Sequence, residues 1–78
     1  MPFKTGNVTL SQLRKILIHV GCKQLGINSG HQKFTRSDLL RPIIIQTHID
    51  PVPEFIVLQI MRTLSLKRVD MEKITNEL

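Results

Sequence analysis

Histidine and cysteine are the side chains of this 78-residue chain best suited to proton transfer or nucleophilic attack, and it has three histidines and one cysteine. Imidazole takes up and releases a proton near neutral pH, so each histidine is a candidate acid or base. His31 directly follows Ser29 and Gly30, a turn signal, and we expect a histidine at such a turn-to-strand junction to be exposed. His19 lies off the apolar stripe of a helical segment, and Cys22 has no partner at a diagnostic catalytic spacing. We therefore expect His19 to be a surface residue and Cys22 a small core residue.

The charge of the chain favours an anionic partner. Eleven Lys and Arg residues against six Asp and Glu residues give a formal net charge of +5. The candidate partners are RNA, DNA, an acidic protein or a membrane surface. A basic protein with no polyanion to bind is the alternative. The aromatic residues are three Phe, which counts against a single-strand binder built on stacked aromatic platforms.

The N-terminal half predicts one helix and then strands. Apolar residues at helical spacing predict a helix over residues 10–20, with Thr9 as its cap and Gly21 as its stop. Strands are expected over residues 22–27, 31–36 and 41–47. The last of these contains the β-branched run Ile43-Ile44-Ile45. Such a run indicates either burial on both faces, or one face under helices and the other under a partner.

The C-terminal half predicts helices. A loop with two prolines over residues 48–53 precedes Glu54, which suits a first helical turn. A helical apolar face follows, although the β-rich residues 55–57 leave a strand as the alternative. Residues 67–77 predict a third, weaker helix. The class is therefore α+β, with the order helix-strand-strand-strand-helix-helix. We expect a three-stranded antiparallel sheet with helices packed on one face and the other face free for RNA or protein.

Four segments together resemble one protein family. They are an opening helix that ends at Gly21, the residues Ser29-Gly30-His31 followed after two residues by Phe34, the run Arg41 to Ile45 with His48 after it, and Ile60-Met61-Arg62 with Leu64. In this order and spacing, from about residue 9 to residue 74, the chain resembles the HicA family of bacterial and archaeal toxins. The resemblance implies a fold similar to a double-stranded-RNA-binding domain.

The resemblance also implies an activity. The chain would be one domain, residues 1–78, with a core over 8–66 and a short C-terminal helix over 67–78. It would be the toxin of a type II toxin–antitoxin system, an endoribonuclease that cleaves messenger RNA without a metal or cofactor. His31 would be the general base that deprotonates the 2′-hydroxyl. A HicB-like antitoxin would cover His31 and the basic face.

Further residues are expected to contact the RNA, the small ones by letting a phosphate approach closely and the basic ones by neutralising it. They are Ser29, Gly30, Lys33, Arg36, Arg41, Lys23 and His48. For the basic residues, a solvated edge that discourages strand-to-strand aggregation is the alternative. For His48, the alternative to an RNA contact is a role in stabilising the turn.

Two other functions stay open. One is a non-catalytic RNA-binding module of the same fold, and the other is a protein-interaction domain or a small DNA-associated basic protein. A single cysteine excludes an internal disulfide and fits a reducing cytoplasm. No charged-then-apolar signal segment opens the chain, and its apolar runs are too short to span a membrane.

Overall fold

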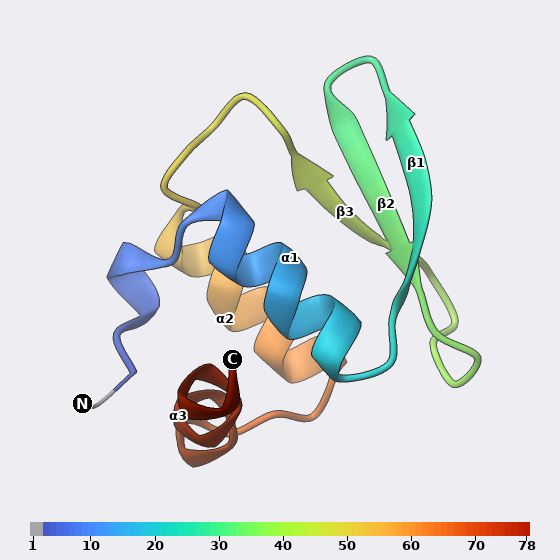
Figure 1. Ribbon diagram of the computed structural model, residues 1–78. Coiled ribbons are helices and arrows are strands. Elements are labelled where there is room, and N and C mark those ends of the chain that lie inside the picture. The colour runs from blue at the N-terminus through green and yellow to red at the C-terminus, as the bar shows by residue number, and fades with distance from the viewer. Residues whose placement is uncertain (1–2) are drawn as a thin grey trace.

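Three antiparallel strands in one open sheet, flanked by three helices, make up the computed structural model, which describes residues 3–78 (Figure 1). In chain order the elements are η1 (Thr5–Asn7), α1 (Leu10–His19), β1 (Lys23–Asn28), β2 (His31–Thr35), β3 (Ile43–Gln46), α2 (Glu54–Thr63) and α3 (Arg68–Glu77). The predicted α+β class is confirmed, and the order is consistent with that of a double-stranded-RNA-binding domain. The alternative of a strand over residues 55–57 is wrong, because these residues lie in α2.

Helix α1 begins and ends where its sequence signals predict. The Oγ1 atom of Thr9 accepts a hydrogen bond from the backbone N–H of Gln12 at 3.1 Å, so Thr9 caps the helix. The apolar stripe of α1 is buried. Gly21 has φ +92°, a conformation that few other residues adopt cheaply, and α1 ends before it.

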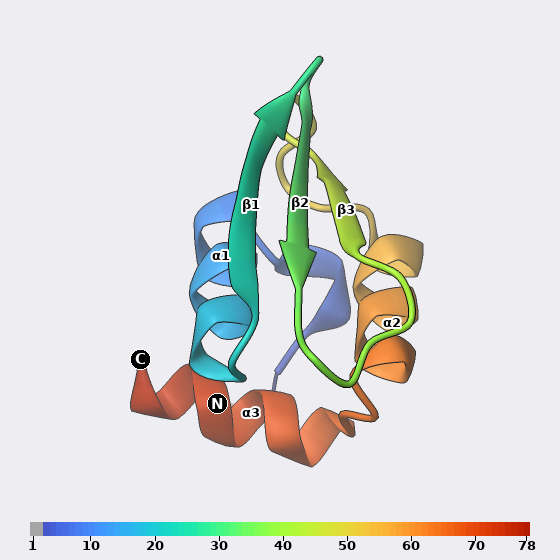
Figure 2. The ribbon, with the colours of Figure 1, turned by 90° about the vertical axis from the view of Figure 1, so that its right-hand side faces the viewer.

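Strand β2 is the middle strand, paired with β1 on one side and β3 on the other. Its side chains alternate, with Gln32 and Phe34 buried and Lys33 exposed. Figure 2 shows α1 and α2 together behind the sheet, and they cover only that face. On β3 the flanking isoleucines are buried, whereas Ile44 is 51% exposed. Burial of the isoleucine run on both faces is therefore wrong for the isolated chain.

Two of the predicted strands are shorter than expected. Arg36 lies just beyond the end of β2, and Arg41 lies before β3 begins. Pro42 has no N–H to donate to a β-ladder, which explains why the third strand starts at Ile43. Both arginines therefore belong to the connection between β2 and β3 and not to the sheet itself.

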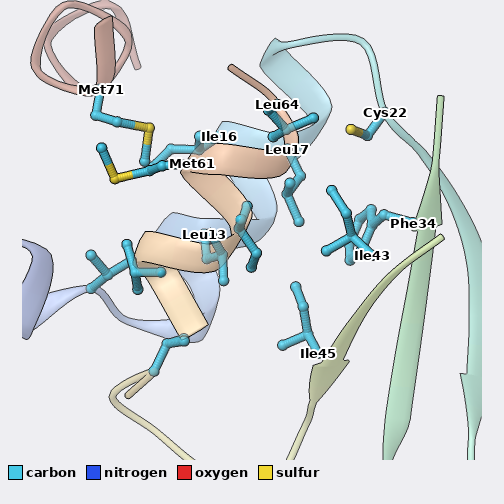
Figure 3. Packing of buried hydrophobic residues seen from close by; sticks show 14 of the residues in the cluster. Leu13, Ile16, Leu17, Cys22, Phe34, Ile43, Ile45, Met61, Leu64 and Met71 are labelled. Atoms are coloured by element: carbon cyan, nitrogen blue, oxygen red, sulfur yellow. The ribbon is translucent and has the colours of Figure 1, made fainter. Parts of the chain in front are cut away.

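The core lies between the sheet and the helices. Figure 3 shows Leu17, Phe34, Ile43 and Leu64 in one cluster, which draws on α1, the sheet and the end of α2. Helix α3 adds Met71 at the foot of the molecule. The core also extends past its expected start at residue 8. The residues before α1 contribute the buried Phe3, Thr5 and Val8, and η1, which was not predicted, lies among them.

The segment between β3 and α2 is attached to the start of α1. The Oδ1 atom of Asp50 accepts a hydrogen bond from the backbone N–H of Leu10 at 3.1 Å. The backbone N–H of Val52 donates to the carbonyl of Val8 at 2.8 Å. Asp50 thus supplies a second acceptor, besides Thr9, to the first turn of α1, where free N–H groups and the helix dipole favour an anion.

Replacing Asp50 with Ala should lower the free energy of unfolding by about 1 kcal/mol, the usual loss when a helix cap is removed. Asp50→Asn keeps a side-chain oxygen that can accept from Leu10, so its loss should be smaller. Urea denaturation of both variants and the wild type measures the difference. An equal loss in the two variants would show that the hydrogen bond is not what Asp50 contributes.

Candidate nucleic-acid interface

The turn between β1 and β2 has a backbone that few residues adopt. Ser29 has φ +53° and Gly30 has φ +78°, so both central residues of this two-residue hairpin loop are left-handed, as in a type I′ turn. This geometry suits the right-handed twist of paired strands. Gly30 takes it without cost, and the turn places His31 opposite Asn28 at the first pair of the hairpin.

The ring of His31 is held by this turn. Its Nδ1 atom lies 3.1 Å from the carbonyl oxygen of Ser29. A carbonyl oxygen only accepts hydrogen bonds, so Nδ1 is the protonated nitrogen of the neutral ring and Nε2 keeps its lone pair. His31 is half-buried, and β2 places it on the sheet face that α1 and α2 leave open. This arrangement presents Nε2 as a proton acceptor.

The residues after β3 complete this end of the sheet. The carbonyl of Gly30 accepts two hydrogen bonds from Thr47, one from the backbone N–H at 2.8 Å and one from Oγ1 at 3.0 Å. A β-carbon built on Gly30 would lie 3.5 Å from Nδ1 of His48. The structure therefore brings Ser29, Gly30, His31 and His48 together at one end of the sheet.

Lys33 lies on the same open face as His31. The two residues are two apart on β2, a spacing of about 7 Å along a strand. Across the ladder to β3, Lys33 faces Ile44 and His31 faces Gln46. None of the six acidic residues of the chain lies in a strand. Neither of the ion pairs found among residues 3–78 involves Lys33, so its charge is available to an anion.

The other predicted phosphate contacts lie at the far end of the sheet. Lys23 pairs with Thr35, and Arg36 follows Thr35. Five residues of strand, roughly 16 Å, separate His31 from Arg36. Lys23 and Arg41 are exposed. The structure thus divides the predicted site into one group around His31 and a second group beyond Lys33.

Arg36 is already engaged within the protein. Its Nε and Nη2 atoms donate to both carboxylate oxygens of Asp38, at 2.6 and 2.9 Å, and Nη1 donates to the carbonyl of Val20 at 3.0 Å. The hydrogen bond from Arg36 holds the pKa of Asp38 below its ordinary value. Arg36 therefore ties the end of β2 to the end of α1, and its guanidinium is not a free phosphate ligand.

Two residues of α1 also have side-chain partners, and the cysteine is buried. On α1, Arg14 donates from Nε to the Oε1 atom of the buried Gln32 at 2.7 Å, and His19 lies 3.1 Å from the carboxylate of Glu77. Cys22 is buried as expected, and burial raises the pKa of its thiol. A raised pKa keeps a thiol protonated and makes it a poor nucleophile.

A pocket beside His31 was not predicted. Its volume is about 530 Å³, and it lies between β3 and the chain that leads into α2. His31 and Gln46 form part of its wall, and so do the exposed side chains of Ile44 and Phe55. Phe55 is not on the buried stripe of α2, so an aromatic residue on the outer side of a helix was the available sequence signal.

No family model, curated protein or solved structure matches the chain. The resemblance to the HicA family therefore stays a prediction from the residues. Within residues 3–78, no helix is both long and apolar enough to cross a membrane. The same residues contain no group of three or more His, Cys, Asp or Glu side chains placed to hold a metal ion.

Gly30→Ala should destabilise the protein by about 1–2 kcal/mol, because the left-handed backbone is costly for any residue with a β-carbon. The added atom would lie at ordinary van der Waals distance from His48, so the amide environments of Thr47 and His48 should change. Ser29→Gly is the matched control. Glycine adopts the left-handed backbone of residue 29 without strain, so this variant should not destabilise the turn. Thermal unfolding reports the stability, and amide chemical shifts of Thr47 and His48 report the segment. Unchanged shifts in a destabilised Gly30→Ala would contradict the contact.

Proposed function

We propose that this protein is a HicA-type toxin, an endoribonuclease that cleaves messenger RNA with His31 as general base. The observation that carries the proposal is the hydrogen bond from Nδ1 of His31 to the carbonyl of Ser29, which leaves Nε2 as the acceptor nitrogen. The resemblance of residues 29–34 and of the element order to the family supports the same function. Exposed lysines on a sheet without acids favour a polyanionic substrate.

The proposed reaction is cleavage of the RNA backbone by its own 2′-hydroxyl, with His31 as the base that removes the proton. Nε2 of His31 takes the proton of a ribose 2′-hydroxyl, and the resulting O2′ attacks the adjacent phosphorus. The bond from phosphorus to the 5′-oxygen of the next nucleotide breaks, and that oxygen takes a proton from water or from Lys33. Lys33, on the same face, offsets charge on the phosphate. The products are a 2′,3′-cyclic phosphate and a 5′-hydroxyl.

Control of such an activity requires that the open face be covered. In the HicA-type function a HicB-like antitoxin takes this part, with acidic groups against Lys33 and an occluding contact over His31. The apolar Ile44 is 51% exposed and lies opposite Lys33 on the edge strand β3, which favours a protein cover as well as RNA. The proposed place of action is the cytoplasm, where messenger RNA is available.

A non-catalytic RNA-binding module is the second candidate. It is favoured by Lys23 and Lys33, both exposed strand residues that would bind phosphates whether or not His31 acts. The two candidates share the surface and differ in the role of one imidazole.

His31→Ala should reduce the rate of RNA cleavage about a hundredfold or more, the usual loss when a general base is removed. His19→Ala, which removes an imidazole on α1 next to Glu77, should cleave at the wild-type rate. Purified proteins on a messenger RNA give the rates, and thermal unfolding checks that both variants fold. Cleavage by folded His31→Ala at the wild-type rate would rule out the proposed base. Absence of cleavage by all three proteins, with RNA binding intact, would leave the binding module.

A further inference from the structure

The pocket between β3 and the start of α2 is not used by the proposed proton transfer. Its volume of about 530 Å³ is within the range of pockets that hold small organic groups. His31 lines one part of the pocket, so the pocket opens directly beside the candidate base. Anything bound there would lie next to the phosphate on which His31 acts.

Three apolar side chains that line the pocket are exposed to solvent. Phe55 is 69% exposed, whereas Phe3 and Phe34, the other two phenylalanines, are buried. Ile44 and Ile49 line the same pocket and are 51% and 36% exposed. Apolar side chains gain free energy when they leave water, so three of them around one hollow indicate a surface that something covers.

Two polar side chains, those of His31 and Gln46, form one part of the pocket wall. His31 and Gln46 are directly opposite each other on β2 and β3, and both line the pocket. Gln46 carries an amide, which has both donor and acceptor groups. The pocket therefore combines an aromatic ring, aliphatic walls and one hydrogen-bonding amide.

We propose that this pocket binds one nucleobase of single-stranded RNA, with the base stacked on Phe55 and its edge hydrogen-bonded to Gln46. This inference rests on the proposed function, because it takes the RNA that His31 acts on as the ligand. Unpaired bases are commonly recognised by stacking on an aromatic side chain and hydrogen bonds to their polar edge. A single Phe offers one stacking position, which is compatible with the scarcity of aromatics in the chain.

A nucleobase fits this surface better than an apolar side chain of a protein partner. An apolar side chain would remove water from the Gln46 amide without replacing its hydrogen bonds, which is costly. The acids nearest the pocket in sequence are Asp50 and Glu54, and they accept hydrogen bonds from Leu10 and from the Oγ1 atom of Thr5. Lys33 lies two residues after His31 on β2, on the same open face, and would bind the neighbouring phosphate.

Binding of one base next to the reacting phosphate would bias cleavage by the identity of a single nucleotide. The amide of Gln46 sets that bias, and Phe55 supplies affinity for any base. We therefore expect a weak preference at one position of the RNA and not a long recognition sequence.

The test is a double-mutant cycle with RNA that cannot be cleaved. A fully 2′-O-methylated hexanucleotide has no 2′-hydroxyl to deprotonate, and an abasic hexanucleotide of the same backbone keeps the charge and removes the bases. Fluorescence anisotropy gives the Kd of both for wild type, Phe55→Ala and Val69→Ala. Val69 is a matched exposed apolar residue on α3, outside the pocket.

Phe55→Ala should raise the Kd for the base-containing RNA about fivefold or more, in line with the loss of one stacked base, and leave the Kd for abasic RNA unchanged. Val69→Ala should change neither Kd. Gln46→Ala should change the order of affinity among hexanucleotides of the four bases. Equal weakening of both RNAs by Phe55→Ala, or no weakening of either, overturns the nucleobase pocket, and an apolar protein segment is then the remaining occupant.

This result is independent of catalysis, so the two proposals fail separately. If wild type cleaves no RNA but the cycle gives the expected coupling, the ribonuclease is wrong and the base pocket stands. If His31-dependent cleavage is observed but the cycle gives no coupling, the ribonuclease stands and the base pocket is wrong. Thermal unfolding of each variant confirms that the comparison is between folded proteins.

Discussion

Burial of one face of a three-stranded sheet under α1 and α2 is the constraint on which the rest of this structure depends. Phe34 and Ile45 lie on the buried face, and strand alternation then places His31, Lys33 and Ile44 on the other. A shift of one residue in register would bury the lysine and expose the phenylalanine, so packing of the core fixes the open face. The candidate site is thus a consequence of how a small chain obtains its core.

The carbonyl oxygen of Gly30 is a second feature that holds the candidate site in place. It accepts both hydrogen bonds from Thr47, and so joins the turn that carries His31 to the segment that leads into α2. Asp50 and Val52 attach the same segment to the start of α1. The segment that leads from β3 into α2 lines the pocket beside His31, and these hydrogen bonds attach it to the turn and to the start of α1, which limits how far this wall of the pocket can move.

Local signals were sufficient to predict the three α-helices and the three strands of this fold. The cap at Thr9, the stop at Gly21 and the turn at Ser29 and Gly30 act over a few residues and are read directly from the sequence. The open face of the isoleucine run was one of two predicted alternatives. It was resolved only by the structure, because alternation cannot be read from three identical residues.

Long-range partners could not be predicted in this way. Arg36 donates to the carbonyl of Val20, and Arg14 donates to Gln32, so two basic residues of the chain have internal roles that no sequence spacing indicates. The pocket could not be predicted from the sequence either, because it forms only where Ile44 of β3 and Phe55 of α2 come together in the fold. Burial of Phe3 was also missed, since a single apolar residue in a short lead-in has no periodicity.

If Nε2 of His31 deprotonates a 2′-hydroxyl, as proposed, the cut ends of the RNA carry a distinctive chemistry. Mass spectrometry of the fragments released by the wild-type protein identifies those ends. Attack by the 2′-oxygen would leave a 2′,3′-cyclic phosphate on the upstream fragment and a 5′-hydroxyl on the downstream fragment. A 3′-hydroxyl together with a 5′-phosphate would show that water attacks the phosphate, and would contradict the claim.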